Sequence, residues 1–250
     1  MTPHDRRRRL LIRRIRITGW CALTSLLVTL IGFLTYFHIV FPADRSATLE
    51  VYRDDRVTTR TLEGVIIMEP AEGATENGLL YFPGAKVDPY SYLYPLVDVA
   101  AAGTTIVIVD PLFNMALFDP RDVDDLIAGV PDVTKWSLAG HSLGGVKACM
   151  VAEHPRVKNL ILFASYCAND ISSLPLNVVH VLGSEDGLLD DTLVSEARAL
   201  VPTDSATIIL EGVNHANFGT YGEQPGDGLS VRTYEEMRKV VGELVMEVIN

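Results

Sequence analysis

Two patterns of hydrophobic and polar positions divide the chain. Residues 17–41 form one continuous apolar run without a single Asp, Glu, Lys or Arg. From about residue 47, short apolar runs alternate with longer stretches of helical periodicity. The first pattern is typical of a membrane-spanning helix and the second of an α/β domain. We therefore predict an Arg-rich segment at 1–16, a transmembrane anchor at 17–41 and one folded domain at 45–250.

The apolar run is long enough to cross a bilayer as a helix. At about 1.5 Å per residue, its 25 residues exceed the roughly 30 Å of the hydrocarbon core. A cleaved signal peptide usually has a shorter apolar region that ends in a small-x-small site, and residues 41–45 (FPADR) offer no such site. An uncleaved anchor fits these features best. A cleaved signal and a buried helix of the folded body are the alternatives.

Charge around the apolar run predicts its orientation. Seven arginines precede the run: Arg6, Arg7, Arg8, Arg9, Arg13, Arg14 and Arg16. Cytoplasmic flanks carry such an excess of cationic residues. We expect a single-pass protein of the cell membrane with its N-terminus in the cytoplasm and its folded body on the extracytoplasmic side.

Composition excludes several classes of function. The chain has 21 Lys+Arg and 32 Asp+Glu, a net charge of -11, and removing seven Arg and Asp5 leaves 14 against 31, or -17, in residues 17–250. A body this acidic repels phosphate backbones, so we expect no nucleic-acid partner. The three cysteines, Cys21, Cys149 and Cys167, are odd in number and widely spaced, which indicates neither a disulfide framework nor a metal site. We expect no metal and no organic cofactor.

The folded part reads as an α/β domain with a mostly parallel sheet. Several apolar runs are continuous and β-branched, as strands buried on both faces are. Predicted strands are 64–68, 79–82, 105–109, 135–138, 159–163, 178–182 and 207–210, and predicted helices are 92–102, 120–128, 143–153, 190–200 and 232–249. Asp44 and Arg45 are expected to begin a polar linker or a first strand.

One strand leads into a motif that carries chemistry. The predicted strand 135–138 runs into Gly140-His141-Ser142-Leu143-Gly144 and then a helix. This is a G-x-S-x-G nucleophile elbow in its strand–turn–helix context. The serine of such a turn is strained, and glycines two residues away let strand and helix approach closely. We predict Ser142 as a catalytic nucleophile; the alternative is an ordinary turn with a helix-capping serine.

A serine nucleophile needs a base and an orienting acid. In the chain order Ser…Asp…His, the histidine follows the last strand, which selects His215 from the six histidines. We expect His141 to make local contacts inside the elbow. The acid is expected after strand 178–182, where Asp186 is our choice. Other carboxylates leave this choice open: the neighbours Glu185, Asp190 and Asp191, and Asp170 after the preceding strand.

An oxyanion hole needs two backbone N–H groups. One belongs to Leu143, the residue after the nucleophile, and the other to a loop after an earlier strand. Strand 79–82 runs into Pro83-Gly84-Ala85-Lys86, where a glycine permits close approach. Ala85 is the expected second donor. Lys86 is either a surface lysine or part of the pocket.

The chain resembles the bacterial α/β-hydrolase fold-5 family, relatives of the dienelactone-hydrolase type. Four segments carry the likeness: 81–89 (YFPGAKVDP), the elbow, 183–187 (GSEDG) and the long run 212–228 that contains His215. The resemblance covers about residues 64–248. It implies an α/β-hydrolase fold and a Ser142–His215–Asp186 triad, but no particular substrate. Dienelactone-type enzymes use a Cys nucleophile, so their reaction is not carried over to this serine.

Loop lengths bear on access to the site. The segment 164–175 has 12 residues, too few for a helical lid, so we expect an open site. The loop 216–228 is the expected wall, with Tyr166, Phe218 and Tyr221 as candidate lining or structural residues. The sequence therefore predicts a membrane-anchored serine hydrolase for a small-molecule ester or related acyl compound. Acyl transfer through the same acyl-enzyme, or a silent binding protein on this fold, are the rival hypotheses.

Overall fold

The computed structural model describes residues 3–249, and its contacts divide into two units, 1–39 and 40–250. The first unit is the helix α1 (Pro3–His38). Its 36 residues extend for about 54 Å. The helix is apolar and long enough over Arg6–His38 to cross a membrane, and none of its most apolar stretch is buried by protein. Residues 17–38 of the predicted anchor lie in this helix, whereas residues 39–41 follow its end.

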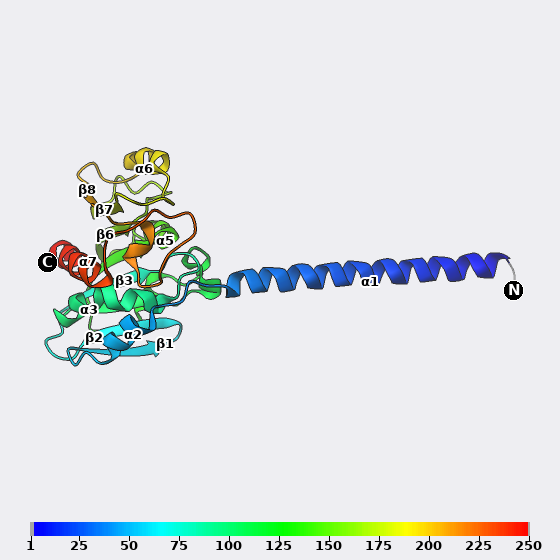
Figure 1. The fold of residues 1–250 in the computed structure, drawn as a ribbon, viewed down its shortest axis with the longest axis horizontal. Coiled ribbons are helices and arrows are strands. Elements are labelled where there is room, and N and C mark those ends of the chain that lie inside the picture. The colour runs from blue at the N-terminus through cyan, green and yellow to red at the C-terminus, as the bar shows by residue number, and fades with distance from the viewer. Residues whose placement is uncertain (1–2, 250) are drawn as a thin grey trace. The chain divides into compact units, whose positions relative to one another are not determined.

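The second unit is built on one eight-stranded sheet (Figure 1), with strand order β1-β2-β4-β3-β5-β6-β7-β8. Neighbouring strands from β4 through β8 are parallel, whereas β1 and β2 are antiparallel to their neighbours. The strands are β1 (Val57–Leu62), β2 (Val65–Pro70), β3 (Asn77–Phe82), β4 (Thr105–Val109), β5 (Lys135–His141), β6 (Val157–Phe163), β7 (Asn177–Gly183) and β8 (Ala206–Leu210). The predicted α/β class and all seven predicted strands are confirmed.

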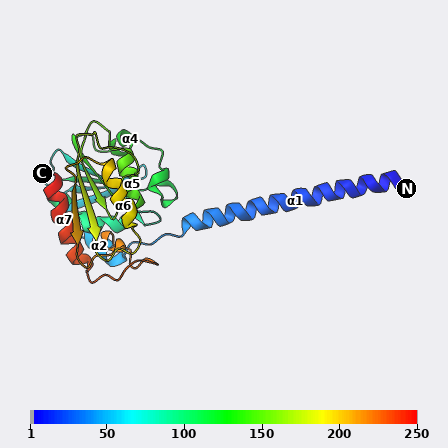
Figure 2. The same ribbon diagram turned by 90° about the horizontal axis from the view of Figure 1, so that it is seen from above.

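Helices cover both faces of this sheet (Figure 2). One face packs against α2, α3 and α7, and the other against α4 and α5. The helices are α2 (Arg45–Tyr52), α3 (Leu93–Ala101), α4 (Val123–Ile127), α5 (Leu143–Met150), α6 (Asp191–Ala197) and α7 (Tyr234–Ile249), with short 3-10 turns between several of them. Each predicted helix is present, and most end one to three residues earlier than expected.

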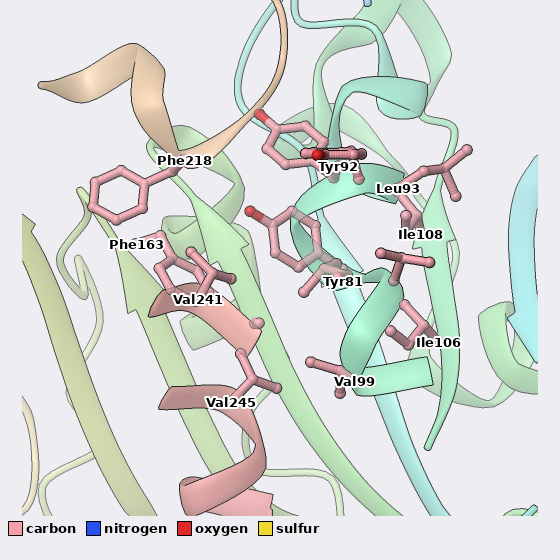
Figure 3. Close-up of a cluster of buried hydrophobic side chains, with 14 of the residues drawn as sticks. Tyr81, Tyr92, Leu93, Val99, Ile106, Ile108, Phe163, Phe218, Val241 and Val245 are labelled. Carbon is pink, nitrogen blue, oxygen red and sulfur yellow. The ribbon is translucent and has the colours of Figure 1, made fainter. Parts of the chain in front are cut away.

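Successive side chains along each strand point to opposite faces of the sheet, so the strands contribute to two hydrophobic cores, one on each face. In β2, Ile66 and Met68 face one core, whereas Val65 and Ile67 face the other. The first core contains a row of aromatic rings, including Tyr81, Tyr92 and Phe163 (Figure 3). This cluster continues to Phe218, which lies in the same 3-10 turn as the predicted catalytic histidine His215. Burial on both faces explains why these strands read as unbroken apolar runs.

The beginning of the folded body differs from the expectation. The segment after Asp44 is the helix α2, neither a linker nor a strand, and the Asp44 carboxylate caps it by accepting the N–H of Ala47 (2.9 Å). Strand β1 was not predicted. It lies at the edge of the sheet and buries only Val57, so it lacks the apolar signal of the inner strands.

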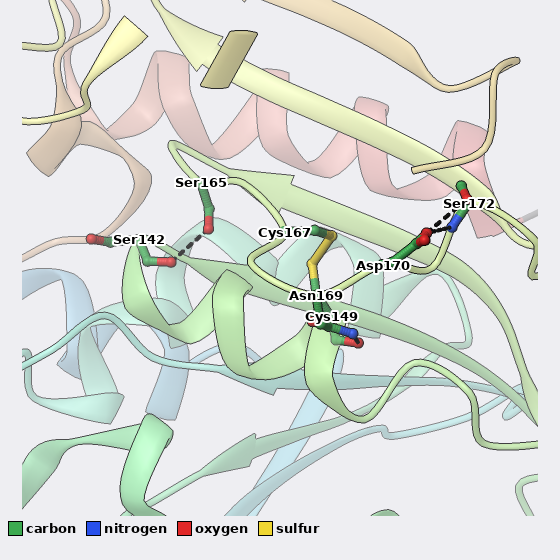
Figure 4. Close-up of a disulfide and its surroundings, with 7 residues drawn as sticks. All are labelled: Ser142, Cys149, Ser165, Cys167, Asn169, Asp170 and Ser172. Carbon is green, nitrogen blue, oxygen red and sulfur yellow. Dashed lines mark hydrogen bonds between the residues drawn. A yellow bond between two sulfur atoms is a disulfide. The ribbon is translucent and has the colours of Figure 1, made fainter. Parts of the chain in front are cut away.

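A disulfide joins Cys149, near the end of α5, to Cys167 in the loop after β6 (Figure 4). Both side chains are buried, and Cys21 on α1 is the remaining cysteine. The expectation that the cysteines carry no disulfide was wrong for this pair. Eighteen residues separate the two in sequence, and only the turn through β6 brings them together.

The disulfide should contribute measurably to stability. A crosslink over a loop of this length restricts the unfolded chain and is worth about 3 kcal/mol. We expect the double variant Cys149→Ala/Cys167→Ala to lose about that much free energy of unfolding in urea. Reduction with dithiothreitol should lower the stability of the native protein but leave the double variant unchanged. Equal stability of the native protein and the double variant would contradict this expectation.

Candidate active site

Ser142 occupies the sharp turn between β5 and α5. Its backbone adopts φ 53° and ψ -128°, a conformation that costs a residue other than glycine about 1–3 kcal/mol. The flanking glycines explain how the turn closes. A Cβ atom at Gly140 would overlap the backbone of Gly144, and one at Gly144 would overlap the carbonyl oxygens of Phe82 and Pro83. The predicted elbow is therefore present, with α5 beginning directly against the end of β3.

Hydrogen bonds from β6 hold the nucleophile turn in place. The N–H of Ser142 donates to the carbonyl of Phe163 (3.0 Å). The buried hydroxyl of Ser165 donates to the carbonyl of Ser142 (2.6 Å), as Figure 4 shows. These two bonds fix the backbone on both sides of the side chain, so its position is set by the sheet.

His215 and Asp186 lie side by side after the last two strands of the sheet. Nδ1 of His215 is 2.8 Å from Oδ2 of Asp186, and each side chain is only 5% exposed. Burial acts to raise the pKa of Asp186, but the hydrogen bond from His215 and those from Leu188 and Leu189 hold it below the usual value. Since Asp186 is then a carboxylate, Nδ1 of His215 must carry the proton, and Nε2 is left as an acceptor.

Ser142 and His215 line the same pocket of about 320 Å³. Its apolar wall comes from the N-terminus of α5 and from the loop that leads into α6. Tyr166 lines the pocket as expected, whereas Phe218 and Tyr221 are buried beneath it; the loop 216–228 contributes Gln224 instead. The remaining lining residues are Leu143, Val146, Ala164, Ser165, Leu188, Leu189, Asp190 and Leu193.

The other carboxylates considered as the acid have different partners. Asp170 accepts the N–H and the hydroxyl of Ser172 (2.9 and 2.7 Å; Figure 4). Asp190 caps α6 by accepting the N–H of Thr192, Asp191 is the first residue of that helix, and Glu185 is exposed and bonded to Ser184. Asp186 is thus the candidate whose carboxylate contacts His215.

The two expected oxyanion donors lie at adjacent strand ends. Phe82 and Gly140 are register partners at the ends of β3 and β5, and both chains then turn toward the site. Leu143 is the first residue of α5, where helix N–H groups have no partner within the helix. Among the hydrogen bonds within residues 3–249, none uses the N–H of Leu143 or Ala85. Both amides are thus available to a ligand oxygen.

His141 connects three parts of the site, a role that its sequence position did not reveal. Its Nε2 lies 3.0 Å from the carbonyl oxygen of His215, which only accepts, so Nε2 carries the proton. Nδ1 therefore accepts from the hydroxyl of Tyr92 (2.9 Å), and that hydroxyl accepts the N–H of Gly84 (3.0 Å). This chain of bonds ties the elbow, the loop 83–86 and the histidine loop together.

Asp227 is a second residue whose role the sequence did not indicate. Its carboxylate accepts four backbone N–H groups: those of His215 (3.1 Å), Ala216 (2.8 Å), Gly187 (3.1 Å) and Gly228 (2.8 Å). One side chain thereby fixes the loop of the histidine to the loop of Asp186. In the sequence, Asp227 belonged to the run 212–228 that carried the family resemblance and to the loop 216–228 that was the expected wall.

The described residues, 3–249, contain no group of three His, Cys, Asp or Glu side chains arranged to hold a metal ion. The site instead combines a serine elbow, a histidine–carboxylate pair and unused backbone amides at the carboxyl edge of a parallel sheet. This combination defines an α/β protein of the hydrolase type.

Comparison with known proteins agrees with this class. Residues 78–239 match the family model described as "Alpha/beta hydrolase family", and the chain belongs to that family. The resemblance noted from the sequence is thus confirmed. A search of curated proteins found no match.

Solved structures with the same fold include a "predicted CIB-like hydrolase" from Thermoplasma acidophilum. It is 14% identical, with a TM-score of 0.55 over 76% of this chain and 98% of the other. The hyperthermophilic esterase from Pyrobaculum calidifontis is 16% identical, with a TM-score of 0.56 over 82% and 90%. At these identities the likeness shows the fold.

Protonation of His141 should govern part of the acid sensitivity of the fold. Burial, followed by the charge of His215, holds the pKa of His141 well below its ordinary 6.5. Below pH 6.5 the unfolded chain therefore binds a proton at this histidine that the native state does not bind. The free energy of unfolding consequently decreases as the pH is lowered. We expect His141→Gln to remove up to about 1.4 kcal/mol per pH unit from this decline between pH 6.5 and 5. Urea unfolding at several pH values measures it; an unchanged slope would contradict the role.

Proposed function

We propose that this protein is a membrane-anchored serine hydrolase that cleaves a carboxylic ester or a related acyl bond. The observation that carries the proposal is the 2.8 Å contact of His215 with Asp186 beside a pocket that His215 shares with Ser142. The hydrogen bond to Asp186 fixes the proton of the neutral imidazole on Nδ1, so that Nε2 of His215 presents the lone pair that a base needs.

The proposed reaction proceeds through an acyl-enzyme. Oγ of Ser142 attacks the carbonyl carbon of the substrate while Nε2 of His215 takes the hydroxyl proton. The N–H groups of Leu143 and Ala85 donate to the oxyanion. As the tetrahedral intermediate collapses, His215 returns the proton to the leaving alkoxide. Water then repeats the sequence, with His215 as the base, and releases the carboxylic acid and free Ser142.

The apolar wall of the pocket supports an acyl group as the part of the substrate that enters. Leu143, Val146, Leu188, Leu189 and Leu193 share the pocket with Ser142. At about 320 Å³ the volume lies at the lower end of the range for small-molecule sites. Transfer of the acyl group to an acceptor other than water would use the same intermediate, and product analysis with added alcohols distinguishes the two reactions.

The proposed location rests on α1 and on the disulfide. The helix is able to span a membrane, and the seven arginines before the apolar run favour a cytoplasmic N-terminus. Disulfides such as Cys149–Cys167 persist in oxidising compartments outside the cytosol. Together these features favour a hydrolase domain on the extracytoplasmic side of the cell membrane.

Substitution of the triad tests the chemistry. We expect Ser142→Ala to abolish both hydrolysis of p-nitrophenyl esters and labelling by a fluorophosphonate probe, and His215→Ala to lose a comparable factor. Asp186→Asn should cost on the order of 10⁴-fold in kcat, because the amide favours the wrong tautomer of His215. Asp170→Asn is the matched control and should retain full activity. An active Ser142→Ala variant, or a native protein that no probe labels, would refute the proposal.

Protease treatment of intact cells tests the location. Added protease should digest residues 45–250 without lysis, and mass spectrometry should find the arginine-rich N-terminus still attached to the untreated protein. The physical reason is the imbalance of cationic residues, seven before the run against Arg45 and Arg53 after it. Protection of the body in intact cells would overturn the orientation, and a mature chain that starts near Ala43 would indicate a cleaved signal.

A further inference from the structure

The segment that follows α1 is fixed to the body beside the active-site loops. The N–H of Phe41 donates to the carbonyl of Lys86 (2.7 Å), and the N–H of Asp88 donates to the carbonyl of Phe41 (3.0 Å). The N–H of Asp44 donates to the carbonyl of Thr220 (2.6 Å). Both partner loops, after β3 and after β8, lie at the carboxyl edge of the sheet. The chain therefore joins the body at the edge that holds Ser142.

A loop with exposed apolar side chains lies next to this junction. The N–H of Lys86 donates to the carbonyl of Asn114 (2.7 Å), which places the turn after β4 alongside Phe41. In this turn Leu112 is 58% exposed and Phe118 is 55% exposed. Its backbone holds Phe113 and Asn114 at positive φ (58° and 54°), a strained conformation for such residues. Strain and exposed apolar surface coincide in a loop outside the catalytic triad.

Chain length limits how far this edge lies from the end of α1. Only Ile39 and Val40 separate His38, the last residue of α1, from Phe41. Three residue steps span at most about 11 Å, whichever way the helix points. A strand of five to seven residues extends for roughly 17–23 Å. The body is therefore tethered to α1 through the carboxyl edge of its sheet, and the opposite edge lies a strand length further into the body.

We propose that the carboxyl edge of the sheet lies against the bilayer that α1 crosses, with Leu112 and Phe118 inserted among the lipid headgroups. The substrate is then an acyl ester carried by the membrane itself, whose chain passes from the lipid into the pocket over the exposed rim of Leu143, Leu188 and Leu193. Apolar and aromatic side chains bind at this depth of a bilayer. The substrate class rests on the proposed ester hydrolysis, whereas the membrane contact does not.

Fluorescence quenching tests the contact without turnover. The full-length Phe118→Trp protein, carrying Trp20→Phe to remove the signal of α1, is reconstituted in phosphatidylcholine vesicles with brominated acyl chains. The emission of the buried Trp136 is measured in the Trp20→Phe protein alone and subtracted. We expect its emission to fall by about half, as for a ring in the interface. The matched control is Met150→Trp: Met150 is 53% exposed but lies at the far end of α5 from Ser142, and its emission should stay unquenched. An unquenched Trp at position 118 would overturn the proposal.

Kinetics test the source of the substrate. Leu112→Ser/Phe118→Ser should lower hydrolysis of a long-chain diacylglycerol in the vesicles by about tenfold, since loss of this apolar contact weakens presentation from the lipid. Hydrolysis of soluble p-nitrophenyl acetate should not change, and Met150→Ser should change neither rate. An equal loss on both substrates would overturn the membrane source. Quenching at position 118 without any ester turnover would refute the proposed function and still support the membrane contact.

Discussion

The close approach of α5 to the end of β3 is the constraint on which the site depends. A side chain at Gly144 would collide with the carbonyls of Phe82 and Pro83, and one at Gly140 with the turn itself. Because these two glycines have no side chain, the strained turn can hold Ser142 at the carboxyl edge of the sheet. The N-terminus of α5 begins directly beneath it. The same contact brings the loop 83–86 next to the helix, so Ser142 and the amides of the two proposed oxyanion donors share one junction.

Two polar residues, the buried His141 and the half-buried Asp227, extend this junction to His215 and Asp186. His141 reaches from the elbow to Gly84, through Tyr92, and to the carbonyl of His215. Asp227 binds the backbone on both sides of the His215–Asp186 pair. Both ring nitrogens of the buried His141 are paired, in a region of low polarity where hydrogen bonds are strong and an unpaired group is costly. The relative positions of the loops are therefore set by residues that do not react.

Sequence reasoning reached the fold and the proposed triad because both leave local signals. Buried parallel strands read as apolar runs, and Ser142, Asp186 and His215 follow strands in a recognisable order. Strand β1 was not predicted because an edge strand with one buried side chain has no such apolar run. The disulfide, the His141 bonds and the Asp227 bonds join residues from elements that are separate along the chain. Their pairing depends on how the strands are ordered in the sheet, which no spacing along the chain reveals.

The Cys149–Cys167 bond has a consequence for newly synthesised chains, in which both thiols are still reduced. Domains are stable by only about 5–15 kcal/mol, so a chain with both thiols reduced lacks a sizeable part of that margin. A loss of about 3 kcal/mol raises the unfolded fraction by about a hundredfold. Proteases and chaperones act on that fraction. Oxidation of one buried pair would thus separate a short-lived newly made chain from a durable enzyme, without any change in the active site.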